Sequence, residues 1–355
     1  MKLLLTTLSL SLALSAPLLA QTEVTPYQPG VTLEGVTYFL PQTALRITVE
    51  AERTQTQPGR FAKYAFRYLR LNDVPLEAKT RWTLKNIRVQ AYGVPDKAKG
   101  YSVKLKNRTV APLVSLSREG ILLSVNAEQA EEQLSATPRR VEGQQPLDAS
   151  RYLGQEVLAA GSTAKMAELV AQEIYDLRDK RKDLIAGEAE NTPKDGAQLQ
   201  LMLQQLDQQA EALEQLFKGS RQTDTEFFAF DYLPSQTGQR DVLFRFSAVN
   251  GPVDAANLLG SPVYVQLTNL EQLPDQTPDA ETAKKKAKQE EGVWYNVPAR
   301  CNVRLFTLDN NYVDTDIAFG QFGHVELLSN VLFDKKATTR VTLHQSNGGV
   351  KKIEN

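Results

Sequence analysis

The chain has 355 residues, with 41 Lys and Arg against 42 Asp and Glu, and a single cysteine. This near-neutral balance disfavours nucleic acid as a partner, because nucleic-acid-binding domains usually carry a strong basic excess. One thiol excludes an internal disulfide framework, so the fold must depend on burial of apolar side chains, which this length permits. Cys301 stands in an alternating run with Val303 and Leu305, which predicts a buried strand thiol and not a nucleophile.

The first 20 residues have the pattern of a secretory signal peptide. Lys2 precedes an apolar run, and Ala20 before Gln21 offers a small residue at the cut. The run is too short for a membrane span, and no later run reaches the roughly 18 apolar residues that a spanning helix needs. We therefore expect an exported protein, periplasmic, outer-membrane-associated or extracellular, with no membrane span.

Alternating apolar and polar residues predict that residues 21–160 form an N-terminal β-rich domain. A phase slip at Lys85-Asn86 predicts a β-bulge, since one extra residue reverses the faces of a strand. The expected elements are strands at residues 45–51, 80–92, 101–105 and 121–125, helical spacing at residues 61–69, and a charged linker at residues 127–161.

Residues 161–220 predict an antiparallel helical hairpin, because two apolar stripes of helical period are joined by a short loop. Ser162 or Thr163 is the expected N-cap of the first arm and Gly187 its C-terminal residue, while Thr192 and Pro193 predict the start of the second arm. The stripes are Met166, Val170, Ile174, Leu177 and Leu184 in the first arm, and Leu199, Met202, Leu206, Ala210, Leu213 and Phe217 in the second.

Residues 221–355 predict a C-terminal β-rich domain with a charged loop at residues 273–292. The runs at 227–233 and 242–248 are expected to form a strand pair, and Pro298 predicts an edge or a bulge. The fold class is therefore α+β, with two mainly antiparallel β regions and a helical hairpin between them. Whether the two β regions share one sheet is left open.

Charge is unevenly divided along the chain. Residues 21–126 carry 16 Lys and Arg against 8 Asp and Glu. Such a basic half is compatible with an acidic glycan or a lipid headgroup as ligand, and equally with a solvated outer face. Tyr92, Tyr101 and Trp294 are the candidate ligand-surface residues, because aromatic rings suit glycan and lipid contacts.

The sequence carries no CxxC, HExxH, GxSxG or glycine-rich phosphate motif. No catalytic residue, cofactor site or metal site is therefore assigned, and neither His324 nor His344 has an evident partner. An acidic run favours a strand-connecting turn over a Ca²⁺ site, since its spacing misses the EF-hand pattern. Its residues are Asp309, Asn311, Asp314 and Asp316. A hydrolase with paired carboxylates remains an alternative, with Asp231 and Asp241 as an example.

Several short motifs are found along the chain, at residues 38–43, 58–62 and 68–69, at the hairpin residues 174–175, 178, 181, 184, 187–188 and 193–196, and at residues 216–219, 293–298 and 321–323. Together they resemble an uncharacterised exported family of Bacteroidetes, of the type called domain of unknown function 4831. The resemblance covers nearly the whole chain after residue 20, and it departs from the family at Asn296, where arginine is more frequent. It implies a Gram-negative envelope or secreted location and supplies no activity.

Three functions follow from these observations. The leading one is a non-enzymatic structural or interaction module of the cell envelope, with an envelope protein or a surface polymer as partner. The alternative is a glycan- or lipid-binding module, and the carboxylate-pair hydrolase is third. The sequence does not indicate an oligomeric state.

Overall fold

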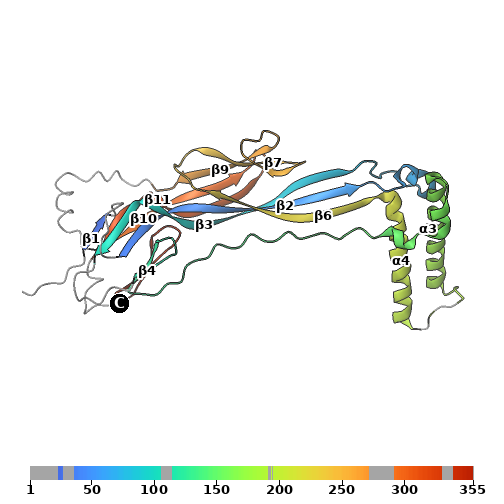
Figure 1. Cartoon of the computed structure of the whole chain (residues 1–355), viewed down its shortest axis with the longest axis horizontal. Coiled ribbons are helices and arrows are strands. Elements are labelled where there is room, and N and C mark those ends of the chain that lie inside the picture. The colour runs from blue at the N-terminus through green and yellow to red at the C-terminus, as the bar shows by residue number, and fades with distance from the viewer. Residues whose placement is uncertain are drawn as a thin grey trace, which may run out of the picture.

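The computed structural model of this chain describes residues 23–26, 36–104, 114–190, 193, 195–271, 292–329 and 339–354. The molecule is elongated, with most strands at one end and the helical hairpin at the other (Figure 1). The expected signal peptide lies outside the described residues, and so does the charged loop apart from Gly292.

The predicted α+β class is confirmed. The described strands form three antiparallel sheets, with the orders β1-β3-β2-β6, β11-β10-β9-β7-β8 and β13-β12-β5-β4. The strands are β1 (Glu23–Pro26), β2 (Val36–Gln57), β3 (Lys79–Lys104), β4 (Val114–Leu116), β5 (Leu122–Val125), β6 (Ser220–Tyr232), β7 (Arg240–Ser247), β8 (Gly251–Val253), β9 (Ser261–Asn269), β10 (Gly292–Phe306), β11 (Asn311–Ser329), β12 (Arg340–Leu343) and β13 (Val350–Glu354).

Strands from before and after the hairpin share sheets. β6 pairs with β2 along its whole length, and β12 pairs with β5. The ranges expected as separate N-terminal and C-terminal β domains are therefore interleaved in two of the three sheets. We call the three sheets, without residues 51–57, 79–84 and 220–226, the β-body.

The expected pairing of residues 227–233 with 242–248 is wrong. β6 pairs with β2, whereas β7 pairs with β8 and β9 in the facing sheet. The physical reason is the core between these sheets, where Phe230 of β6 stacks on Phe244 of β7 at 4.6 Å between ring centroids. The connection after β6 thus carries the chain from one sheet to the other.

Two irregularities expected in the strands are confirmed. In the β2–β3 ladder Glu50 pairs with Asn86 and Ala51 with Leu84, which leaves Lys85 as the extra residue of a bulge. The β10–β11 register shifts at Pro298, which cannot donate a ladder hydrogen bond.

The main core lies between the first two sheets. It confirms Cys301 as a buried strand thiol, and burial raises the pKa of that thiol to about 11. A thiolate at neutral pH is therefore disfavoured. The fully enclosed residues of this core are Leu45, Ile47, Val49, Ile87, Phe244, Val263, Val265, Leu267, Cys301, Val303, Leu305 and Phe319.

Three strands extend from the β-body as an arm toward the hairpin, through residues 51–57 of β2, 79–84 of β3 and 220–226 of β6. The 22 residues of β2 span about 70 Å at roughly 3.3 Å per residue. Residues 127–148, part of the expected linker, run the length of the molecule beside this arm (Figure 1). We call this segment the strap.

The strap is fixed to the arm at Asp224. The side chain of Asp224 is fully buried and accepts hydrogen bonds from Arg53, Arg140 and the Gly143 amide. The Gly143 bond and the two guanidinium groups hold the pKa of Asp224 far below its usual range. Beside it, Val141 forms a backbone bridge with Thr225. The segment is therefore bound to the arm along this part of its length.

The hairpin consists of α3 (Thr163–Ala186) and α4 (Gly196–Lys218). Ser162 caps α3 by accepting from the Lys165 amide, and Gly187 ends it in the left-handed conformation at φ 73°, as expected. The expected start of the second arm is wrong by a few residues. Asp195 is the N-cap, because its carboxylate accepts from the Ala197 amide.

A separate core joins the base of the hairpin to residues 61–74, which follow β2. The rings of Phe61 and Phe217 pack in a tilted arrangement with centroids 5.4 Å apart, and both are fully buried. Tyr68 accepts a hydrogen bond from the Tyr175 hydroxyl through its carbonyl, at 2.9 Å. The short elements of this region are η1 (Ala62–Tyr64), α1 (Ala65–Leu69), η2 (Ala149–Tyr152) and α2 (Gln155–Ala159).

Candidate functional site

The three aromatic residues expected at a ligand surface lie in two places. Tyr101 of β3 and Trp294 of β10 stack at 5.7 Å with an interplanar angle of 21°. Tyr92 lies earlier on β3, where its ring is 5.7 Å from the Arg46 guanidinium. The structure thus joins two of the three and separates the third.

The Tyr101–Trp294 stack continues inward to Tyr38, whose ring lies 5.7 Å from Tyr101. Tyr38 is fully buried, and its hydroxyl accepts from the Trp294 amide at 2.9 Å and donates to the Trp294 carbonyl at 3.3 Å. Burial raises the pKa of Tyr38 well above its ordinary value. The inner part of the stack holds β2, β3 and β10 together, and only the half-buried rings of Tyr101 and Trp294 offer an outer surface.

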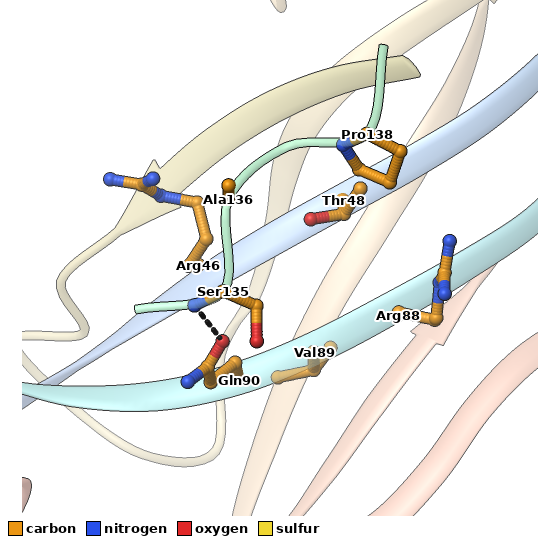
Figure 2. A pocket seen from close by; sticks show the side chains of 8 residues that line it. All are labelled: Arg46, Thr48, Arg88, Val89, Gln90, Ser135, Ala136 and Pro138. Carbon is orange, nitrogen blue, oxygen red and sulfur yellow. Dashed lines mark hydrogen bonds between the residues drawn. The ribbon is translucent and has the colours of Figure 1, made fainter. Parts of the chain in front are cut away.

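A pocket of about 330 Å³ lies between the strap and the outer face of β2 and β3. Figure 2 shows the strap crossing both strands, with the Ser135 amide donating to Gln90 Oε1 at 3.0 Å. That volume is at the lower end of the range for small-molecule sites. The lining residues are Arg46, Thr48, Arg88, Val89, Gln90, Ser135, Ala136 and Pro138.

The two arginines of this strap pocket differ in how firmly they are paired. Arg46 makes a two-point contact with Asp231, from Nε to Oδ1 at 2.5 Å and from Nη2 to Oδ2 at 3.0 Å. Arg88 meets Glu50 only at 4.0 Å, and 57% of its side chain is exposed. An anionic ligand could therefore bind Arg88 while breaking fewer existing contacts than it would at Arg46.

A second hollow lies between the distal halves of α3 and α4, with a volume of about 650 Å³. Its wall includes Leu201 and Met202, whose exposed fractions are 57% and 37%. We call it the hairpin groove. It is lined by Lys180, Asp183, Leu184, Ala189, Glu190, Leu201, Met202, Gln205, Leu206 and Gln209.

The carboxylates suggested for a hydrolase do not converge. Asp231 faces outward on β6 beside Arg46, whereas Asp241 accepts a hydrogen bond from the Tyr232 hydroxyl. Because Asp231 and Tyr232 are consecutive on a strand, their side chains point to opposite faces of the sheet. Each carboxylate therefore has its own partner.

Two residues of the acidic run, Asp314 and Asp316, lie in β11 and pair with arginines of β10. Asp316 contacts Arg300 at 2.6 Å, and Asp314 lies 3.6 Å from Arg304. Asn302 donates to both carboxylates. Within the described part of the chain, no group of three or more His, Cys, Asp and Glu side chains is arranged to hold a metal ion.

One polar group, formed by Tyr295, His324 and Glu326, was not predicted from the sequence. His324 Nε2 lies 2.8 Å from Glu326, and the other oxygen of Glu326 accepts from the Tyr295 hydroxyl at 2.9 Å. Burial and the Glu326 carboxylate raise the pKa of Tyr295 to about 12. The signal was the spacing of two between His324 and Glu326, which places both side chains on one face of β11. The group is partly exposed and lines neither hollow.

Comparison with known families agrees with the resemblance of the motifs. A family described as Domain of unknown function (DUF4831) matches residues 34–351. The chain belongs to the DUF4831 family. No curated protein and no solved structure matches it significantly.

Some of the DUF4831 motif residues meet inside the β-body. The Thr43 amide donates to Gln321 Oε1 at 2.8 Å, and Gln321 Nε2 donates back to the Thr43 carbonyl at 2.9 Å. Asn296 is fully buried, and its Nδ2 donates to the carbonyls of Pro41 and Asn347, both at 2.9 Å. These bonds tie β2, β10 and β11 together.

Other motif residues meet at the hairpin base. The Phe61 amide donates to the Leu216 carbonyl at 2.6 Å, and a Cβ on Gly59 would lie 2.4 Å from that same oxygen. Of the motif residues, Leu184 lines the hairpin groove and none lines the strap pocket. The contacts described for the DUF4831 motifs thus hold the fold together, and the two hollows are built mainly from other residues.

Proposed function

We propose that this DUF4831 chain is an exported, non-enzymatic interaction protein of the cell envelope. In this proposal the β-body and the arm hold the hairpin at a distance, and the hairpin meets a partner protein. The single observation that carries it is the apolar hairpin groove at the end of the molecule remote from the β-body (Figure 1). Exposed apolar grooves of this kind are typical of protein-binding surfaces.

Export is supported by the signal-peptide pattern of residues 1–20. Among the described residues, no helix is both long and apolar enough to cross a bilayer. Export is tested by fractionating cells that express the full chain and sequencing the N-terminus of the product. The expected product is found outside the cytoplasm and begins at Gln21. An intact Met1 terminus in the cytoplasmic fraction would overturn this part of the proposal.

A non-enzymatic role is supported by the state of the candidate acids. Asp231 is bound by Arg46, Asp241 by Tyr232 and Asp316 by Arg300. A general acid or base needs a carboxyl group free to exchange a proton with a substrate.

The partner-binding role is tested by photo-crosslinking in the native cell. A benzophenone amino acid replaces Leu201 in the hairpin groove, and in a control chain it replaces Leu259, which is 73% exposed in the loop between β8 and β9. Irradiation is expected to give a discrete protein adduct from position 201 and none of the same mass from position 259. Equal or absent adducts from the two positions would contradict the proposal.

A second candidate function is binding of an acidic glycan in the strap pocket. It is favoured by the donor-rich lining, since Arg88, Gln90 and two hydroxyl groups face a space of about 330 Å³. Tyr92 lies next to it, against Arg46. Guanidinium groups with neighbouring hydroxyl and amide donors suit carboxylated sugars.

This second function is tested by titrating the chain with a uronate oligosaccharide and, separately, with vesicles of anionic lipid. Arg88→Ala should weaken oligosaccharide binding about tenfold, while Arg118→Ala, at an arginine with 91% side-chain exposure outside the pocket, should not. Binding to vesicles alone, or an equal loss of oligosaccharide binding in both variants, would show that binding depends on the general basic charge of the surface. Either result would reject the pocket as a glycan site.

A further inference from the structure

The first half of α4 differs from ordinary surface helices in having no charge. Residues 196–206 contain no Lys, Arg, Asp or Glu, and Asp207 is the first charged residue of α4. Leucine, methionine and glutamine supply most of this stretch. Depletion of charge together with exposed apolar side chains is the composition that marks the centre of protein interfaces.

The same half of α4 lacks the burial that usually stabilises a helix. The fully buried residues of α4 are Ala212, Leu213 and Phe217, all near its C-terminus. A helix of about 12–15 residues is marginal in water without tertiary packing. Leu206 and Ala210 already pack against the hairpin core from partly buried positions. Residues 196–205 therefore gain least from contacts within one chain, and a covering partner would stabilise them.

The position of the hairpin leaves the groove accessible. Figure 1 shows α3 and α4 running crosswise to the arm and extending away from it, with the β-body at the opposite end of the molecule. Two hairpins could approach each other without their β-bodies meeting. Antiparallel helix pairs commonly complete their core as four-helix bundles.

We infer that the hairpin groove is occupied by the hairpin of a second copy of this chain, forming a two-fold four-helix bundle. This inference rests on the proposed partner-binding role and names the partner. The groove carries three charged residues, Lys180 and Asp183 on α3 and Glu190 in the loop after it. Lys180 and Asp183 have opposite charges, and neither forms an ion pair with another described residue. A two-fold axis brings Lys180 of one copy toward Asp183 of the other, and the uncharged α4 side adds no repulsion.

The experiment is sedimentation velocity on residues 21–355 over a range of concentrations. The wild-type chain is expected to pass from monomer to dimer as the concentration rises. Leu201→Glu with Met202→Glu should raise the dissociation constant at least about tenfold, because two carboxylates enter the apolar contact. Leu259→Glu is the matched control, an exposed leucine outside the groove, and should leave it unchanged.

A charge exchange tests the arrangement independently of apolar burial. Lys180→Glu alone should weaken the dimer, because it places an acid near Asp183 of the other copy. The double variant Lys180→Glu with Asp183→Lys should recover the wild-type dissociation constant. Circular dichroism on each variant checks that the hairpin still folds, and both residues are exposed.

Each outcome decides the inference. A monomer at every concentration, or a dimer equally weakened by Leu259→Glu, overturns self-association in the groove. If the monomer nevertheless yields a crosslink from position 201 to another protein, the partner-binding role stands and its occupant is not a second copy. Absence of any crosslink from position 201, to this chain or to another, removes the proposed function itself.

Discussion

The core between the first two sheets and the hairpin groove use similar apolar side chains with opposite results. Phe244, Val263 and Val265 are fully buried, because each sheet presents its apolar face to the other. Leu201 and Met202 line the groove and remain 57% and 37% exposed. A sheet that faces a second sheet completes its own core, whereas two helices alone leave one side of their apolar stripes open.

The same contrast exists within the hairpin. At its base, Phe217 packs on Phe61, which follows β2, and Arg178 and Lys218 both contact Glu214. Burial raises the pKa of Glu214, but the bonds from these two cations outweigh it, so the pKa of Glu214 is lowered overall. At its tip, nothing among the described residues covers Leu201. The base is therefore a structural joint and the tip is a surface.

The largest expected effect comes from the two closed cores. Phe244→Ala and Phe217→Ala each remove a fully buried ring and should each cost about 3–5 kcal/mol. Phe244→Ala should lower the free energy of unfolding of the β-body, measured by urea denaturation. Phe217→Ala should mainly speed hydrogen exchange in α3 and α4. If Phe217→Ala destabilised the body as much as the hairpin, the two cores would be one cooperative unit and the comparison would fail.

The next effect concerns the joint between strap and arm. Asp224→Asn should destabilise the chain by about 2 kcal/mol, less than a fully buried pair, because Arg53 and Arg140 are partly exposed. The folded-state pKa of Asp224 is lowered, so its stabilisation is present above the unfolded value near 3.9. It is lost as the pH falls through the folded value. The difference in thermal unfolding temperature between the wild-type chain and Asp224→Asn should therefore shrink as the pH falls below about 4. A difference that stays constant with pH would contradict this role.

Two glycines allow a matched comparison of base and tip. Gly219 ends α4 at φ 75°, and a Cβ there would lie 2.2 Å from the Gln57 carbonyl oxygen of the arm. Gly187 ends α3 at φ 73°, and no described residue beyond its own helix and chain neighbours has an atom within 4 Å of such a Cβ. Gly219→Ala should cost about 2–3 kcal/mol from strain and clash, and Gly187→Ala about 1 kcal/mol from strain alone. Equal losses would show that the base packs no more tightly than the tip.

The smallest effect is expected at the helix caps. Ser162→Ala and Asp195→Ala each remove one capping hydrogen bond, worth about 1 kcal/mol. Ser162 caps α3, whose first half buries one face in the hairpin core. Loss of this cap should therefore lower the unfolding free energy of the hairpin. Asp195 caps the open half, so its loss should appear mainly as faster exchange of nearby amides. A global loss from Asp195→Ala would mean that the tip is coupled to the base.

The sequence predicted what depends on local pattern. The hairpin, the Lys85 bulge, the Ser162 cap and the burial of Cys301 all follow from periodicity or turn chemistry within a short stretch. The pairing partners of β6 and β7 do not follow from local pattern, because pairing between distant strands is decided by which faces meet in the core. Periodicity also could not distinguish the buried base of α4 from its open tip.

The candidate sites were predicted only in part. Tyr101 and Trp294 meet as aromatic neighbours, but Tyr92 joins Arg46 in a different place. The strap pocket depends on residues about 45 apart in sequence, such as Gln90 and Ser135, whose contact no local pattern encodes. The exposure of Leu201 could have been predicted, since this residue lies off the apolar stripe of α4 in a stretch without charges.

Hydrogen exchange of the α4 amides at low and at high protein concentration tests the central claim most directly. If a second hairpin covers the groove, amides of residues 197–209 should exchange more slowly at the higher concentration, while those of β9 and β10 do not change. Leu201→Glu with Met202→Glu should abolish the difference. Exchange in residues 197–209 that is independent of concentration in the wild-type chain would contradict the account.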